Sequence, residues 1–85
     1  MSRSYYADFI PKFRDGSEDA ILGALVGQAE FSVEQTQRDA WISQIRILKK
    51  TLSVYEGKIY FEYAIPRMGR RIDVLLLIGS VIFIL

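Results

Sequence analysis

Two residue types that carry much of protein chemistry are missing from this 85-residue chain, which contains no cysteine and no histidine. Without cysteine there is no disulfide framework, no thiolate zinc site and no cysteine nucleophile. Without histidine there is no imidazole metal ligand and no histidine-based catalytic triad. Any chemistry performed by the chain must therefore use carboxylates, lysine, tyrosine, serine or a metal ion bound through oxygen.

An excess of charge of one sign is also lacking. The 11 basic and 10 acidic residues give a formal net charge of +1, which by itself does not indicate a nucleic-acid partner. Hydrophobic residues make up 51% of the chain and aromatic residues 13%, which is typical of a folded protein. Because no repeat, linker or low-complexity tract interrupts the sequence, residues 1–85 are interpreted as one small domain.

Long hydrophobic segments are limited to the C-terminal end. Met1–Phe13 has scattered charges and no apolar core of a secretory signal, so we expect a cytoplasmic protein. The uncharged run Val74–Leu85 is shorter than the about 20 residues that a membrane-spanning helix needs. We therefore favour a buried hairpin and no membrane contact, with a truncated anchor or interfacial segment as the alternative.

The first part of the chain, about residues 4–53, carries helical patterns. Apolar spacing predicts a short helix over Ser4–Ile10, before Pro11. Ser17 follows a turn signal and is the predicted N-cap of a second helix, which is expected to stop near Gly27.

The third predicted helix is the longest, at about Val33–Ser53. Ser32 and Gln35 match the pattern of a capping box, and Phe31 precedes them as a hydrophobic staple. The pair Lys49-Lys50 is expected in solvent near the C-terminal end of the helix, where the dipole favours cations. Apolar residues at helical spacing predict the buried stripe of this helix: Trp41, Ile45, Leu48 and Leu52.

From about residue 58 the apolar period changes from 3.6 residues to two. Lys58–Ile65 is predicted as a strand with Glu62 on its solvent-facing side. Arg71–Ile78 and Ser80–Leu85 are predicted as strands joined by a tight Gly79-Ser80 turn, and their continuous apolar character predicts cover on both faces. The expected apolar face of the first strand contains Ile59, Phe61, Tyr63 and Ile65.

These patterns predict an α+β fold. About three helices are followed by a three-stranded antiparallel meander over residues 58–85.

The grouping that could carry chemistry lies between residues 67 and 73, where three arginines precede Asp73. A carboxylate at the head of an apolar strand is costly to bury unless it is paired or binds a cation. Two interpretations are open: an ion pair with Arg67 or Arg71 that caps the hairpin, or a metal ligand.

The same region resembles the core of the PD-(D/E)XK nucleases, through Gly69–Leu76, Gly79 and Val81–Leu85. More closely, Phe31–Leu85 resembles the N-terminal region of bacterial proteins that join a nuclease-like module to a Schlafen-related, helicase-like NTPase domain. The segments that carry this resemblance are Glu34–Trp41, Tyr60–Tyr63 and Ile65–Asp73. The resemblance implies an incomplete restriction-endonuclease-like core.

The resemblance also implies roles for individual residues. Asp73 would be the first ligand of Mg²⁺ or Mn²⁺, with Glu62 and Glu34 as auxiliary acids. The family's Glu-x-Lys motif would follow directly after Leu85, and neither it nor an NTPase phosphate-binding loop is present in this sequence. We therefore expect no catalytic turnover from this polypeptide. The implied contacts to nucleic-acid phosphates are Arg67, Arg70 and Arg71.

Three functions are consistent with the sequence. The favoured one is a truncated nuclease-like interaction domain that forms a homodimer or larger assembly through its C-terminal strand or apolar sheet face. The second is a nucleic-acid-binding module of winged-helix type, with Val33–Ser53 as recognition helix and Arg67–Arg71 near the wing. The third is a metal-dependent nuclease completed by a partner chain or by residues beyond Leu85.

Overall fold

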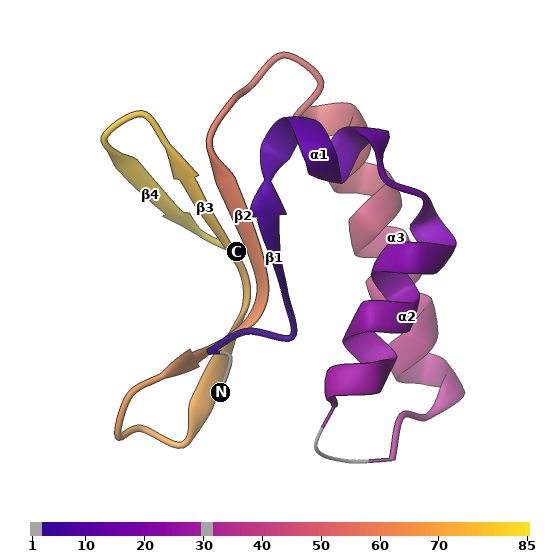
Figure 1. Ribbon diagram of the computed structural model, residues 1–85. Helices are drawn as coiled ribbons and strands as arrows, with labels where there is room; N and C mark the ends of the chain where they lie inside the picture. Colours follow the sequence, from indigo (N-terminus) through magenta and orange to yellow (C-terminus); the bar gives the residue numbers. More distant parts are fainter. Residues whose placement is uncertain (1–2, 30–31) are drawn as a thin grey trace.

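The computed structural model describes residues 3–29 and 32–85 and arranges them in two layers, with helices on one side and an antiparallel sheet on the other (Figure 1). The predicted α+β class is confirmed. None of the helices in the described ranges is long and apolar enough to cross a membrane. The elements, in chain order, are β1 (Tyr6–Phe9), α1 (Ile10–Asp15), α2 (Glu18–Gln28), α3 (Gln35–Thr51), β2 (Lys58–Ile65), β3 (Arg70–Ile78) and β4 (Val81–Ile84).

The sheet contains four strands in the order β1-β2-β3-β4, one more than the sequence pattern predicts. The additional strand is β1, so the predicted helix over Ser4–Ile10 is wrong. β1 pairs with β2 from Tyr6↔Phe61 to Phe9↔Lys58, and these long-range backbone bonds outweigh the weak tendency of so short a helix to form. The helix α1 begins only at Ile10, with Pro11 in its first turn, where a missing N–H costs no helical hydrogen bond.

The two longer helices lie close to their predicted positions. Ser17 is confirmed as the N-cap of α2, since its Oγ accepts a 3.0 Å hydrogen bond from the Ala20 N–H. The predicted capping box of α3 is wrong: Glu34 is the N-cap, and in the described part of the chain no side chain caps this helix end. The predicted staple residue Phe31 lies outside the described residues.

The core fills the space between the two layers. The predicted stripe of α3 is confirmed, because each of its four residues is at most 6% exposed. Aromatic rings connect the layers: the centroids of Phe13 and Phe61 lie 5.8 Å apart, and Tyr5 meets Trp41 edge-on at 6.4 Å. The largest fully buried side chains are Trp41, Phe13, Phe61, Ile10, Leu25, Ile45, Ile59 and Val74.

The alternation of faces along β2 changes at Glu62, which has a φ of 55°. The rings of Tyr60 and Tyr63 meet edge to face with centroids 5.6 Å apart, so residues three positions apart share one face. In a regular strand they would point to opposite faces. Because Phe61 faces the core, Tyr60 and Tyr63 lie on the face turned away from the helices, and the predicted position of Tyr63 on the apolar core face is wrong.

The β3–β4 hairpin has the predicted Gly79-Ser80 turn, with Ile78 paired to Val81 and a Gly79 φ of 61°. The expectation that both of its strands are covered on both faces is wrong for β4, whose residues are all exposed. Figure 1 shows the reason: β4 is the strand farthest from the helical layer, which covers the sheet only near β1–β3.

Candidate functional site

The predicted carboxylates Asp73 and Glu62 lie on neighbouring strands. The pairs Phe61↔Val74 and Tyr63↔Ile72 flank them, so Asp73 stands opposite Glu62 in the antiparallel register. Asp73 is exposed and Glu62 is half-buried. The structure therefore brings together two of the three predicted acids at the bend of the hairpin.

Glu62 does not point into solvent as predicted. Its Oε2 accepts a 3.4 Å hydrogen bond from Nε1 of Trp41, a core residue of α3. Burial raises the pKa of the Glu62 carboxyl above its usual value, and the charge of Asp73 raises it further. The hydrogen bond from Trp41 and the charge of Arg71 act in the opposite direction. The positive φ of Glu62 accounts for this inward turn, because it moves the side chain out of the regular alternation.

The third predicted acid, Glu34, is exposed at the N-terminal end of α3. Within residues 3–29 and 32–85, no group of three or more acidic side chains could hold a metal ion. Two carboxylates remain, and one of them, Glu62, is half-buried, has a raised pKa and accepts a hydrogen bond from Trp41. This donor set does not fit the magnesium or manganese site that the nuclease resemblance implies.

The three predicted arginines have different environments. Arg71 packs its guanidinium over the ring of Tyr5, 4.3 Å from the centroid, and donates a 2.8 Å hydrogen bond from Nη1 to the Glu62 carbonyl. This arginine therefore holds the bend of β2 in place. Arg67 and Arg70 are exposed, Arg67 in the turn and Arg70 at the start of β3.

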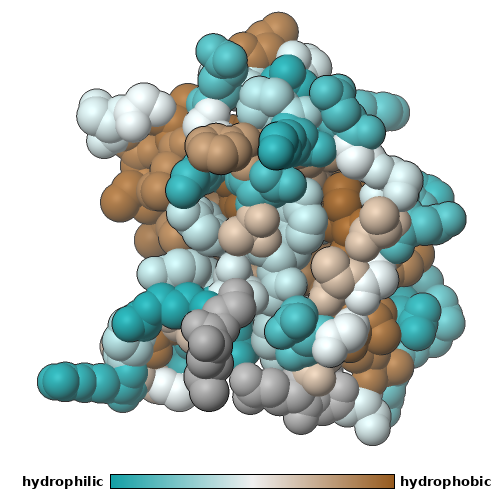
Figure 2. Space-filling view, viewed as in Figure 1, coloured by the Kyte–Doolittle hydropathy of each residue, from teal (hydrophilic) through white to brown (hydrophobic). Residues whose placement is uncertain are grey.

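A second surface is formed by β4, which has no charged residue. Its side chains are 44–66% exposed, although every one of them is apolar. Figure 2 shows hydrophobic surface gathered where Figure 1 places the β3–β4 hairpin. In this sheet order, β4 pairs with β3 on one side, and its other edge is bordered by no described strand. An uncharged apolar edge of this kind is a template for strand pairing.

An open apolar groove of about 270 Å³ borders β4 on its helix-facing side. It is lined by Phe83 and Leu85, by Leu48 of α3 and by Leu52, the C-cap residue of that helix. The groove thus lies beside the last two residues of the core stripe, which are themselves buried. The other lining residues are Thr51, Tyr55, Leu76 and Ile78.

One feature of the structure was not predicted from the sequence. Lys49, expected in solvent, instead donates hydrogen bonds to the carbonyl oxygens of Phe13 at 2.7 Å and Arg14 at 2.9 Å, and also to that of Gly16. It therefore ties the end of α1 to α3. The exposed apolar edge of β4, in contrast, lies in the C-terminal strand through which the sequence predicts assembly.

Comparison with known proteins adds no constraint on the site. No family model, no curated protein and no solved structure matches this chain. The nuclease resemblance therefore stays a prediction, and the functional argument rests on the geometry of the surfaces described above.

Proposed function

We propose that this chain is an interaction module that associates with a second copy of itself through β4. The observation that supports the proposal is that every side chain of β4 is apolar and at least 44% exposed. Contiguous exposed apolar patches on folded proteins are typical of interaction sites. Pairing along the strand edge would supply backbone hydrogen bonds and remove this surface from water at the same time.

A second copy is the partner that fits the chemistry of this edge. Two identical β4 strands can pair in antiparallel fashion about a twofold axis, which makes one surface complementary to itself. Only apolar side chains would then meet across the axis, with no like charges opposed. The net charge of +1 gives little long-range repulsion between copies.

The apolar groove would contribute on the helix-facing side of the same interface. Phe83 lines the groove, and its register partner Leu76 belongs to the core. Strand pairing would place the corresponding apolar residues of the second copy beside Phe83. The interface would thus extend the hydrophobic core of each chain across the twofold axis.

Sedimentation equilibrium at tens of micromolar protein tests this proposal. The wild-type chain should sediment as a dimer or larger species, and Ile82→Lys should sediment as a monomer, since a lysine on an edge strand opposes pairing. The matched control is Ile47→Lys on α3, because Ile47 and Ile82 have nearly equal exposure, 62% and 63%. A monomeric wild-type chain would contradict the proposal, as would equal dissociation of the two variants.

A further inference from the structure

A different surface lies on the face of β1–β3 that is turned away from the helices. The register places Phe9 beside Lys58 and Ala7 beside Tyr60, and Tyr63 joins Tyr60 on the same face through the bend at Glu62. Phe9 is 54% exposed, and the two tyrosines are half-buried. Three aromatic rings thus lie along one face of the sheet, with no helix over them.

Cationic side chains lie at both ends of this aromatic row. The Lys58 Nζ lies 5.1 Å from the centroid of the Phe9 ring. At the other end, Arg70 pairs with Ile65, two residues along β2 from Tyr63 and hence on the same face. Within the described residues, neither Lys58 nor Arg70 forms an ion pair, so both charges are available to an anion.

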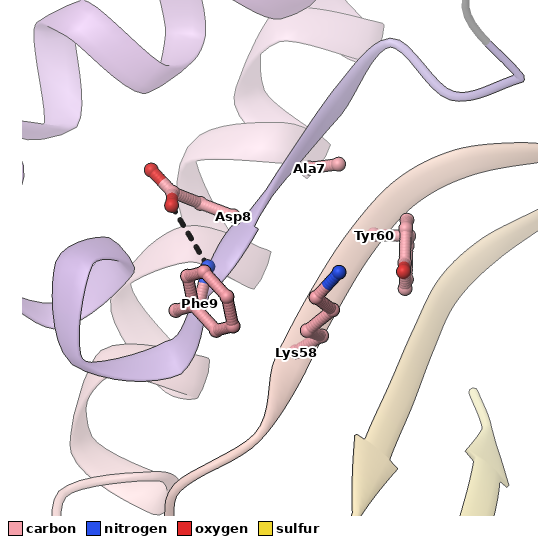
Figure 3. Close-up of a pocket in the computed structure, with 5 residues that line it drawn as sticks. All are labelled: Ala7, Asp8, Phe9, Lys58 and Tyr60. Carbon is pink, nitrogen blue, oxygen red and sulfur yellow. Dashed lines mark hydrogen bonds between the residues drawn. The ribbon is translucent and has the colours of Figure 1, made fainter.

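An open pocket accompanies each of these cations. The first, of about 210 Å³, is lined by Lys58, Tyr60 and the three residues Ala7–Phe9 (Figure 3). The second, of about 200 Å³, is lined by Arg70, Arg71, Gly69, Ala64 and Ile65. Along β2, Tyr63 lies between the residues that line the first pocket and those that line the second.

Two of the three neighbouring carboxylates are turned away from this face. Asp8 accepts a 2.8 Å hydrogen bond from the Phe9 N–H, and Figure 3 shows its carboxylate directed away from the Lys58 ammonium. Glu62 is turned to Trp41 on the opposite side of the sheet. Asp73 is the exposed carboxylate of β3, and it stands at the bend opposite Glu62.

We propose that this face of β1–β3 is a binding site for single-stranded nucleic acid. Unpaired bases stack on exposed aromatic rings of a sheet, and cations beside the rings hold the phosphates. Other four-stranded sheets that bind single strands stack two or three bases on aromatic rings in this way. A duplex keeps its bases paired and stacked, so it would offer this surface only phosphates. The site is separate from the β4 edge and does not depend on self-association.

The test is fluorescence anisotropy with labelled oligo-U and oligo-dT of about eight nucleotides, and with a duplex of the same length. Binding should be stronger for the single strands and should weaken as salt is added. Tyr63→Leu should reduce the affinity about tenfold, while Tyr63→Phe, which keeps the ring, should not. Phe9→Leu supplies a second stacking variant at an exposed position, should Tyr63→Leu fail to fold.

Variants that remove charge distinguish binding at this site from non-specific electrostatic binding of nucleic acid to the protein surface. Lys58→Gln together with Arg70→Gln should lower the salt-dependence slope by about 1.4, because each phosphate contact on a single strand contributes about 0.7. Lys50→Gln, an exposed lysine on α3, is the matched control and should have little effect. The proposal is overturned if no single strand binds at low salt, if the duplex binds equally well, or if Lys50→Gln weakens binding as much as Lys58→Gln together with Arg70→Gln.

Discussion

Phe61 and Phe83 are both phenylalanines on strands of one sheet, and both lie on its helix-facing side. Phe61, on β2, is completely buried against Phe13 and Tyr6. Phe83, on β4, is 44% exposed and lines an open groove. The local sequences are similarly apolar, so position in the sheet decides which residue builds the core and which remains available to a partner.

The comparison distinguishes the part of the sheet that builds the core from the part that remains available to a partner. β2 has a strand on each side and helices above it, whereas β4 has one neighbouring strand and lies beyond the helical layer (Figure 1). Burial of an apolar side chain stabilises the fold, and an exposed one contributes to stability only if a partner covers it. The following substitutions test this division.

The largest expected effect distinguishes the two phenylalanines directly. Phe61→Ala should lower the free energy of unfolding by about 3–5 kcal/mol, since it removes a fully buried ring and leaves a cavity. Phe83→Ala should cost about 1 kcal/mol or less at concentrations where the chain is monomeric. Urea denaturation followed by the fluorescence of Trp41, the single tryptophan, measures both. Equal losses would break the comparison.

Two glycines extend the comparison to the backbone. Gly57, before β2, has a φ of 139°, and a Cβ there would lie 2.0 Å from the carbonyl oxygen of Leu77. Gly79, in the β3–β4 turn, also has positive φ, but no described atom lies within 4 Å of its Cβ position. Backbone strain alone costs about 1–3 kcal/mol at such sites. Gly57→Ala should therefore lower the urea midpoint clearly more than Gly79→Ala, and the reverse order would contradict the register of β2 and β3.

Two adjacent lysines provide a test in the helical layer. Lys49→Met should lower the free energy of unfolding by about 1–3 kcal/mol, because it leaves the carbonyl oxygens at the end of α1 without their donor. Lys50→Met, one residue further and exposed, should change it by less than about 0.5 kcal/mol. Thermal unfolding of the two variants under identical conditions compares them. A larger effect at Lys50 would show that the contacts of Lys49 are not maintained in solution.

The smallest effect concerns the carboxylates at the bend of the sheet. Burial raises the pKa of Glu62 in the folded protein above its usual 4.5, so the folded state holds this proton more tightly than the unfolded state. Its contribution to stability is therefore present at low pH and is lost as the pH rises through the raised pKa. Since Glu62 is only half-buried, we expect a change of less than about 1 kcal/mol.

Glu62→Gln isolates this contribution, because its amide oxygen can still accept the Trp41 hydrogen bond. The variant should gain stability over wild type between about pH 5 and 7, and the two should converge at lower pH. The carboxyl of Glu18 has a lowered pKa, because it forms a hydrogen bond with Arg46. Its contribution to stability is therefore lost as the pH falls, which is the opposite direction to that of Glu62. Urea titrations across this range measure the difference. A constant difference at every pH would show that Glu62 does not titrate as proposed.

Much of the fold could be predicted from the sequence where local pattern and burial agree. The stripe of Trp41, Ile45 and Leu48 predicts α3, and the alternation in Lys58–Ile65 predicts β2 within its observed bounds. β1 could not be predicted, because its four residues form a strand only through pairing with β2. The secondary-structure propensity of so few residues is weak, so long-range pairing determines whether they form a helix or a strand.

The candidate sites were less predictable, because one depends on the φ angle of a single residue and the other on how far the helical layer extends over the sheet. The positive φ of Glu62 turns its carboxylate inward and brings Tyr63 beside Tyr60, which a strict period of two excludes. An apolar strand such as β4 fits either a covered or an uncovered position, and only the reach of the helices decides between them.

The central claim, that β4 pairs with a second copy, is tested most directly by disulfide cross-linking. Because the chain lacks cysteine, a single cysteine placed in turn at residues 81–85 is unique. In antiparallel pairing about a twofold axis, a residue meets its own copy only at the axis, so the one position at the axis, or the two that flank it, come within the about 4.4–6.8 Å between Cα atoms that a disulfide requires. We predict efficient cross-linking that is confined to one position or two adjacent positions in β4, with little at the exposed control Ile47→Cys on α3. Uniformly low cross-linking along β4, or equal cross-linking at Ile47→Cys, would contradict the account.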